Sequence, residues 1–232
     1  MAVASLKFGF YGEGVTDDRF LPAIIVRTAR KILDIHGRYE LDVLEPILVS
    51  RSIMANCSSG DERIMQAARK TMGCDVLVIH LDADAPDAQK TLDNRFKPGA
   101  QKVYEAEENL CRCLVPIVPV RMSAAWMIAD GPTLVTLLSP TLKLDELRAS
   151  KEIRLPRKPH EVESNVDPKQ TLSQIIGFSQ SHRRRASRRV NPTDIQVQLG
   201  GSIRLDKLEK VPSYGRFVQD MTQALISIGM AE

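Results

Sequence analysis

Two short apolar runs, each ending in acidic residues, constrain the fold of this chain more than any other feature. Residues 6–11 lead into Glu13, and residues 76–81 lead into Asp82 and Asp84. Both runs are rich in β-branched or aromatic residues and precede helix-like segments, which is typical of parallel strands buried on both faces. In open parallel sheets, ligands bind beyond the carboxyl ends of the strands. The three carboxylates are therefore expected at one edge of an α/β sheet.

Strand-like and helix-like segments alternate through residues 1–150. We expect strands at 6–12, 41–49, 75–81 and 114–120, helices at about 17–36, 58–72, 99–112 and 122–130, and a polar loop at 86–97. Pro46 places the second strand at an edge or a bulge, because proline lacks the amide proton that a central strand donates. The alternation predicts one α/β domain whose four-stranded sheet is mainly parallel and is flanked by helices.

Residues 151–232 differ in character and have too few apolar residues for an independent domain. The first part is rich in proline and charge, and helices are expected at about 168–181 and 213–228. We interpret the region as a mostly helical appendage packed on the core. Between its helices lie Arg183, Arg184, Arg185, Arg188 and Arg189. Such a cluster can neutralise nucleic-acid phosphates, although charge runs are more often solvated loops.

Composition limits the class of protein. The chain has 232 residues and a formal net charge of +3, which is too small to indicate nucleic-acid binding by itself. None of its four cysteines forms a Cys-x-x-Cys pair, which argues against a structural zinc site. The N-terminus lacks the layout of a signal peptide, and no apolar stretch reaches about 18 residues. We therefore expect a cytoplasmic protein with no membrane partner, and the oligomeric state stays open.

The acidic residues predict a divalent-metal site. Mg²⁺ prefers oxygen ligands, and Asp82 and Asp84 would point to the same side of an extended segment. Glu13 could be a third ligand or a general acid or base. Arg121 follows the fourth strand, so it could bind a phosphate; the alternative is a salt bridge to Asp130 or to another acidic residue. Acidic residues in such loops also commonly cap helices or face water, and that reading stays open for all three carboxylates.

Two further side chains are interpreted as core residues. His80 lies inside an apolar strand, where a buried histidine is a more frequent finding than a catalytic base. Trp126 has Met122, Ala125 and Ala129 at helical spacing and is expected to pack in the core.

The order of these motifs resembles a known family. Glu13-Gly14-x-Thr16-Asp17, followed after a long gap by Leu81-Asp82-Ala83-Asp84, is similar to the TOPRIM domain of topoisomerases, primases and nucleases of the overcoming-lysogenisation-defect class. Residues 119–130, 155–169 and 212–217 resemble further segments of a stand-alone bacterial TOPRIM-like family. The likeness therefore runs through nearly the whole chain.

This resemblance implies a TOPRIM-like fold and a nuclease that uses Mg²⁺ or Mn²⁺, held by Glu13, Asp82 and Asp84, on nucleic-acid phosphodiesters. It also implies a role in antiphage defence. One position departs from the pattern, because Ala124 stands where the family has a glutamate. If that glutamate completes the metal site, this chain lacks one ligand, and its activity would be weak, would need only one metal, or would be absent. A chain with little or no activity would be a binding or sensor subunit beside a separate ATPase. A phosphatase or nucleotidyl transferase with the same acidic cluster is a third alternative.

Overall fold

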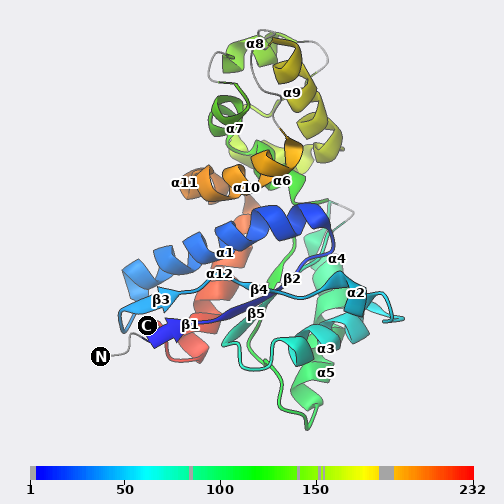
Figure 1. The fold of residues 1–232 in the computed structure, drawn as a ribbon, viewed down its shortest axis with the longest axis vertical. Coiled ribbons are helices and arrows are strands. Elements are labelled where there is room, and N and C mark those ends of the chain that lie inside the picture. Colours follow the sequence, from blue (N-terminus) through cyan, green and yellow to red (C-terminus); the bar gives the residue numbers. More distant parts are fainter. Residues whose placement is uncertain (1–3, 84–85, 140–141, 151–152, 154, 183–190) are drawn as a thin grey trace.

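The computed structural model describes residues 4–83, 86–139, 142–150, 153, 155–182 and 191–232. At its centre is a four-stranded sheet in the order β4-β2-β5-β6, and every neighbouring pair is parallel. Its strands are β2 (Phe8–Tyr11), β4 (Ile47–Leu48), β5 (Val76–His80) and β6 (Leu114–Ile117), while β1 (Ala4–Leu6) pairs with β3 (Leu41–Val43). The predicted α/β class, a parallel sheet flanked by helices, is confirmed (Figure 1).

Helices surround the sheet. The longer ones are α1 (Val15–His36), α3 (Gly60–Lys70), α5 (Lys97–Glu105), α7 (Gly131–Leu138), α9 (Pro168–His182), α10 (Pro192–Ser202) and α12 (Pro212–Ser227). The shorter ones are α2 (Arg51–Met54), α4 (Ala88–Thr91), the π-helix η1 (Leu92–Phe96), α6 (Ala124–Ile128), α8 (Leu144–Ala149), the 3-10 helix η2 (Pro159–Ser164) and α11 (Leu205–Leu208). Across the described part of the chain, we find no helix with the length and apolar character that a membrane span requires.

Four sequence expectations need correction. The helix expected at 99–112 ends at Glu105. The strand expected at 6–12 is interrupted at Lys7, whose backbone N–H donates to Asp75 Oδ2 at 2.7 Å. The strand expected at 41–49 is interrupted around Pro46, and its second half, β4, is an edge strand. The loop expected at 86–97 is wrong, because α4 and η1 occupy most of that segment.

The side chains of the central strands alternate between two apolar clusters. Phe10 of β2 and Val78 of β5 face the cluster that contains residues of α1 and α12. Leu77 and Ile79 of β5 belong to the other cluster, together with residues of α3 and α5. Because both faces of the sheet are covered, its strands appear in the sequence as nearly continuous apolar runs.

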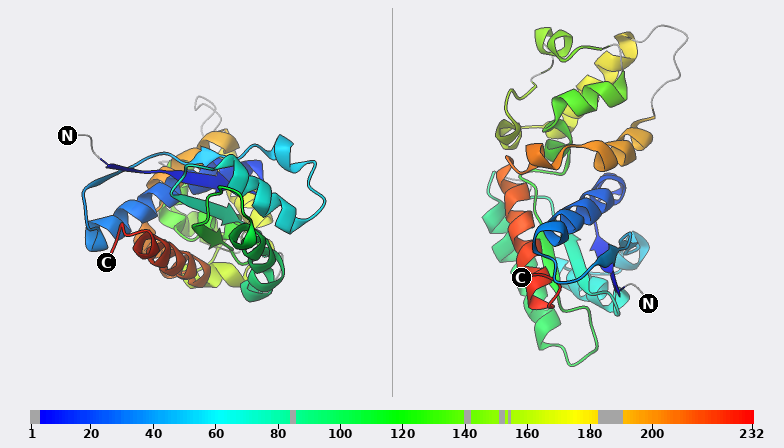
Figure 2. Two further views of the ribbon diagram at one scale, coloured as in Figure 1. Left: turned by 90° about the horizontal axis from the view of Figure 1, so that it is seen from below. Right: turned by 90° about the vertical axis from the view of Figure 1, so that its left-hand side faces the viewer.

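Helices α6 to α11 gather at one end of the molecule, and the sheet lies toward the other (Figures 1 and 2). α12 then returns to pack beside β6 and α1. The C-terminus reaches the end of α1, where Glu232 N donates to the His36 carbonyl at 2.9 Å. The sequence predicts α6, α9 and α12 in this region, and α7, α8, α10 and α11 are additional.

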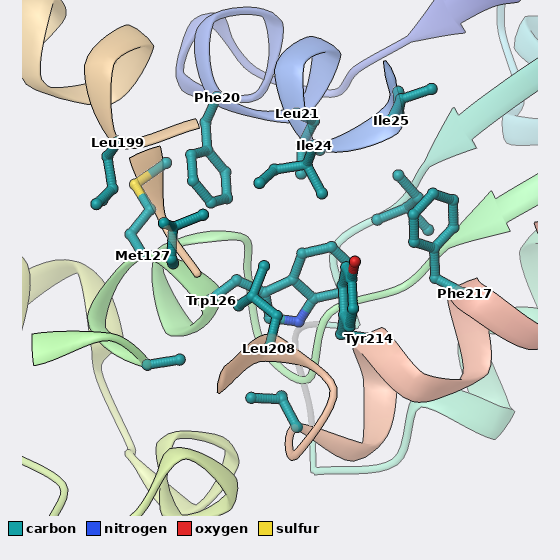
Figure 3. Packing of buried hydrophobic residues seen from close by; sticks show 14 of the residues in the cluster. Phe20, Leu21, Ile24, Ile25, Trp126, Met127, Leu199, Leu208, Tyr214 and Phe217 are labelled. Atoms are coloured by element: carbon teal, nitrogen blue, oxygen red, sulfur yellow. The ribbon is translucent and has the colours of Figure 1, made fainter. Parts of the chain in front are cut away.

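Trp126 of α6 joins the two parts of the molecule. Its side chain is fully buried, and its Nε1 donates to Ser213 Oγ at 2.8 Å. The Tyr214 ring meets it edge-on, with centroids 5.3 Å apart and planes at 84°. Figure 3 shows Trp126 among side chains of α1, α11 and α12. The interpretation of Trp126 as a core residue is confirmed.

Candidate functional site

Glu13 and Asp82 meet at the carboxyl edge of the sheet. β2 and β5 are parallel neighbours, with Tyr11 opposite Ile79, so the residues that follow the two strands emerge side by side. The Asp82 backbone N–H donates to Glu13 Oε2 at 2.7 Å. The loop that carries Glu13 is tightly packed, because a Cβ on Gly12 would lie 2.8 Å from Asp18 Oδ1.

Arg95 binds both of these residues, and the sequence gives no sign of it. Its Nη2 forms an ion pair with Glu13 Oε1, and its Nη1 donates to the Asp82 carbonyl at 3.0 Å. Arg95 lies in the π-helix η1, within the segment expected to be a loop. π-Helical turns are rare and occur frequently at functional sites. Both oxygens of Glu13 are therefore occupied by partners from the chain itself.

His80 lies beneath this pair, between two carboxylates. Its side chain is fully buried on the α1 face of the sheet. Nδ1 is 3.3 Å from Asp17 Oδ2, and Nε2 is 3.3 Å from Asp82 Oδ1. Neither contact has hydrogen-bond geometry, so both ring nitrogens and Asp82 Oδ1 are buried without a hydrogen-bond partner. His80 is thus a buried residue, as expected, but one held between acidic groups.

Asp17 is fixed from two sides. Ser123, just before α6, donates its hydroxyl to Asp17 Oδ1 at 2.6 Å, and Gly14 N donates to Oδ2 at 2.8 Å. In the sequence Asp17 stands out only as part of the Glu13-Gly14-x-Thr16-Asp17 motif, because its contacts with His80 and Ser123 depend on the tertiary fold. A polar chain therefore runs from Ser123 through Asp17 and His80 to Asp82.

The carboxylates shift the titration of their neighbours. Burial lowers the pKa of His80, but Asp17 and Asp82 raise it by more, so the pKa lies above its ordinary value. Burial also raises the pKa of Tyr11, at the end of β2, and the Glu13 carboxylate raises it further. Glu13, Asp17 and Asp82 thus act electrostatically on the side chains around them.

The other predicted site residues are placed only in part. Asp84 lies outside the described residues, as do Arg183, Arg184, Arg185, Arg188 and Arg189. Arg121 lies beyond β6, near Asp82, because the Ala83 N–H donates to the Pro119 carbonyl at 3.4 Å. Its backbone has φ of 66°, and its Nε is buried without a hydrogen-bond partner. Asp130, its alternative partner, instead forms an ion pair with Arg204 at 3.0 Å.

The described residues do not form a complete metal centre. Within them, no three His, Cys, Asp or Glu side chains are grouped so that they could hold an ion. Glu13 and Asp82 are two oxygen donors of the expected kind, and the third predicted ligand, Asp84, is not described. Ala124, at the position of the family's glutamate, is buried and contributes only a methyl group.

A pocket of about 480 Å³ opens beside Asp82. Gly14, Thr16 and Asp17 at the start of α1 line one side, together with Ser123 and Ala124. One face of α9 lines the pocket as well, as does Gln196 of α10, whose Oε1 accepts from Arg19 Nη1 of α1 at 3.5 Å. The acidic edge of the sheet therefore faces the helical end of the molecule across this pocket.

Comparison of the chain with protein-family models, curated proteins and solved structures gives no match. The resemblance to the TOPRIM family therefore stays a prediction. The structure itself shows a parallel α/β sheet with Glu13, Asp82 and the buried His80 at its carboxyl edge. Arg95 of η1 contacts Glu13 and Asp82 there.

Proposed function

We propose that this chain is a divalent-metal-dependent nuclease of the TOPRIM type, which hydrolyses phosphodiester bonds of DNA or RNA. The observation that carries the proposal is the convergence of Glu13 and Asp82, with Asp82 N 2.7 Å from Glu13 Oε2, beyond two adjacent parallel strands. This edge is where α/β folds place their ligands. Paired carboxylates there are suited to Mg²⁺ or Mn²⁺.

The residues present fit a cation in part. Asp82 Oδ1 is buried and faces His80 Nε2 at 3.3 Å, but the Asp82 side chain as a whole is 28% exposed, so a cation can reach its other oxygen. Glu13, Asp82 and the predicted ligand Asp84 would hold the ion. Bound there, it would supply Lewis acidity to a phosphoryl oxygen and to an attacking water. Arg95 already contacts Glu13 Oε1, so a cation must compete with the guanidinium for this oxygen.

The surrounding side chains would orient the donors. His80 supports Asp82 from below, and Asp17 and Ser123 hold the imidazole in place. We expect Arg121 and the arginines between 183 and 189 to bind the phosphate backbone. Such contacts carry no base information, so sequence preference should be low.

Two observations favour a second candidate, a catalytically weak or inactive TOPRIM-fold subunit that works beside a separate ATPase. Ala124 supplies no carboxylate at the pocket, and Arg95 neutralises Glu13. In this case the acidic edge would be a structural ion-pair network. Such networks also perturb pKa values, so the raised pKa of His80 does not discriminate between the candidates.

The experiment that separates the two candidates is cleavage of supercoiled plasmid, single-stranded DNA and RNA, with Mg²⁺ or Mn²⁺ and with EDTA. The wild type is compared with Asp82→Asn, which keeps the side-chain size, and with Asp42→Asn on the exposed part of β3 as control. Metal-dependent cleavage lost only in Asp82→Asn supports the nuclease. No cleavage, together with no rise in melting temperature on adding metal, contradicts it and favours the binding subunit.

A further inference from the structure

The pocket beside Asp82 has a second wall that the proposed chemistry does not use. This wall is one face of α9, on which Lys169, Ser173, Gly177 and Gln180 are spaced by three or four residues. Such spacing places them on one side of the helix. All four are exposed to solvent, although they face the rest of the molecule across the pocket. The protein therefore keeps this face of α9 uncovered.

Gly177 leaves the middle of that wall open. A Cβ at this position would meet no atom within 4 Å. Glycine weakens a helix interior by about 1 kcal/mol relative to alanine, and no positive φ requires it here. The pocket thus has space for a flat group against the α9 backbone.

The lining combines chemical groups that match a nucleotide. Leu172 and Ile176 of α9 provide apolar surface for the face of a base. The amide of Gln180 can both donate and accept hydrogen bonds, as a base edge requires, and Gln196, whose Oε1 accepts from Arg19 Nη1 at 3.5 Å, can donate through its Nε2. Lys169 provides a positive charge for a phosphate.

The size of the pocket decides between a single strand and a duplex. A volume of about 480 Å³ is in the range of small-molecule sites. The major groove of B-DNA alone is about 12 Å wide, so a base-paired duplex is too large to enter. A single unstacked nucleotide is the largest part of a nucleic acid that fits.

We propose that this pocket binds one unstacked nucleotide of a single-stranded nucleic acid, with its base against α9 and its phosphate at Lys169. The inference rests on the proposed function, since it assigns a substrate class to the same site. It makes the helical end of the molecule the element that selects single strands over duplexes. A free mononucleotide has the same chemistry, and the test distinguishes it from a strand.

The test is binding in EDTA at physiological salt, which requires neither metal nor cleavage. The probes are a fluorescein-labelled 12-nucleotide single strand, the same sequence as a blunt duplex, and unlabelled nucleoside monophosphates as competitors. Gly177→Leu fills the pocket, and Gly201→Leu is the matched control, because a Cβ at Gly201 of α10 also meets nothing within 4 Å. Circular dichroism checks that both variants are folded.

We expect the wild type to bind the single strand at least about tenfold more tightly than the duplex. Gly177→Leu should raise the Kd by about tenfold or more, and Gly201→Leu should leave it within about twofold. Equal binding of duplex and single strand, or normal binding by Gly177→Leu, overturns the inference. Competition by a monophosphate at the affinity of the strand overturns the assignment to a strand. If pocket-dependent binding is found but metal produces no cleavage, the inference stands and the nuclease proposal fails.

Discussion

The helical end of the molecule approaches the sheet in two places that differ in how their polar groups are satisfied. Around Trp126 the buried polar groups are paired, as in the Trp126–Ser213 contact at 2.8 Å and the Tyr214–Thr28 contact at 2.8 Å. At the edge beside Asp82, buried nitrogen and oxygen atoms have no hydrogen bond. In the part of the chain that the structure describes, every buried side-chain nitrogen or oxygen atom that lacks a hydrogen bond belongs to a residue that precedes α6. The first contact region stabilises the fold through hydrogen-bonded pairs, whereas the second holds His80 between the Asp17 and Asp82 carboxylates at 3.3 Å without hydrogen-bond geometry.

The largest effect is expected at the first region. Trp126→Ala removes a fully buried indole and leaves the Ser213 hydroxyl and the Tyr214 ring without their partner. We expect the free energy of unfolding to fall by about 3–5 kcal/mol. Urea denaturation followed by circular dichroism measures it, with Tyr39→Ala, 65% exposed, as the aromatic control. If Trp126→Ala lowered the free energy of unfolding no more than Tyr39→Ala does, Trp126 would not hold the helical end and the sheet together.

The next effect tests an ion pair within the helical end. Asp130 is fully buried, caps α7 through Thr133, and forms ion-paired hydrogen bonds with Arg204 at 3.0 Å. Asp130→Ala should reduce stability by about 2–3 kcal/mol at pH 7, because a cap and charged hydrogen bonds are lost together. Asp145→Ala, whose side chain is 92% exposed, is the control and should change little.

Asp130 also makes the stability of the folded protein depend on pH. Burial would raise the pKa of Asp130, but hydrogen bonds from Arg204 and Thr133 lower it by more, so its folded-state pKa is below the ordinary value. Its stabilisation is therefore complete above the unfolded pKa of about 3.9 and is lost as the pH falls toward the folded value. The stability difference between wild type and Asp130→Ala should shrink below about pH 4. A difference that grows there would contradict the assigned direction.

Two neighbouring glycines of α10 test how closely this helix packs against α1. A Cβ on Gly200 would lie 2.5 Å from the Phe20 carbonyl oxygen of α1, whereas one on Gly201 meets nothing within 4 Å. Gly200→Ala should destabilise the protein by about 1–3 kcal/mol, because α1 and α10 must separate. Gly201→Ala should stabilise it by up to about 1 kcal/mol through helix propensity. Equal effects in thermal denaturation would mean that the helices have room to move apart.

The sequence predicts the sheet well because burial on both faces leaves a strong pattern. Parallel pairing then accounts for the meeting of Glu13 and Asp82, which are 69 residues apart. Helix α10 escapes prediction because Gly200 and Gly201 give it low helix propensity, and its contacts with α1 stabilise it instead. Arg27 contributes by donating to the Gly200 carbonyl at 2.8 Å, near the end of α10.

The sequence predicts the candidate site less completely than the sheet, because several site residues meet only through tertiary contacts. Arg95 is one of many charged residues between 86 and 97, and its ion pair with Glu13 spans 82 residues. A π-helix has no sequence signature of its own, so this segment resembles a polar loop. Ser123 and Asp17 likewise acquire their roles only when α6 is placed against the start of α1.

The smallest change in stability, at Arg95, gives the sharpest information on the site. Its ion pair with Glu13 is partly exposed, at 33% and 20% of the two side chains, so Arg95→Met should reduce stability in EDTA by under about 1 kcal/mol. The freed Glu13 carboxylate should then bind a cation more tightly, because the competing guanidinium is gone. Mn²⁺ should therefore raise the melting temperature of Arg95→Met more than that of the wild type.

Lys97→Met is the control for Arg95→Met, because Lys97 pairs with the exposed Asp93 and does not contact Glu13. It should respond to Mn²⁺ as the wild type does. If Arg95→Met instead loses the response to Mn²⁺, as Glu13→Gln should, then Arg95 holds Glu13 in place for the ion and does not compete with it. If none of these proteins responds to Mn²⁺, the ion pair at the edge of the sheet is structural.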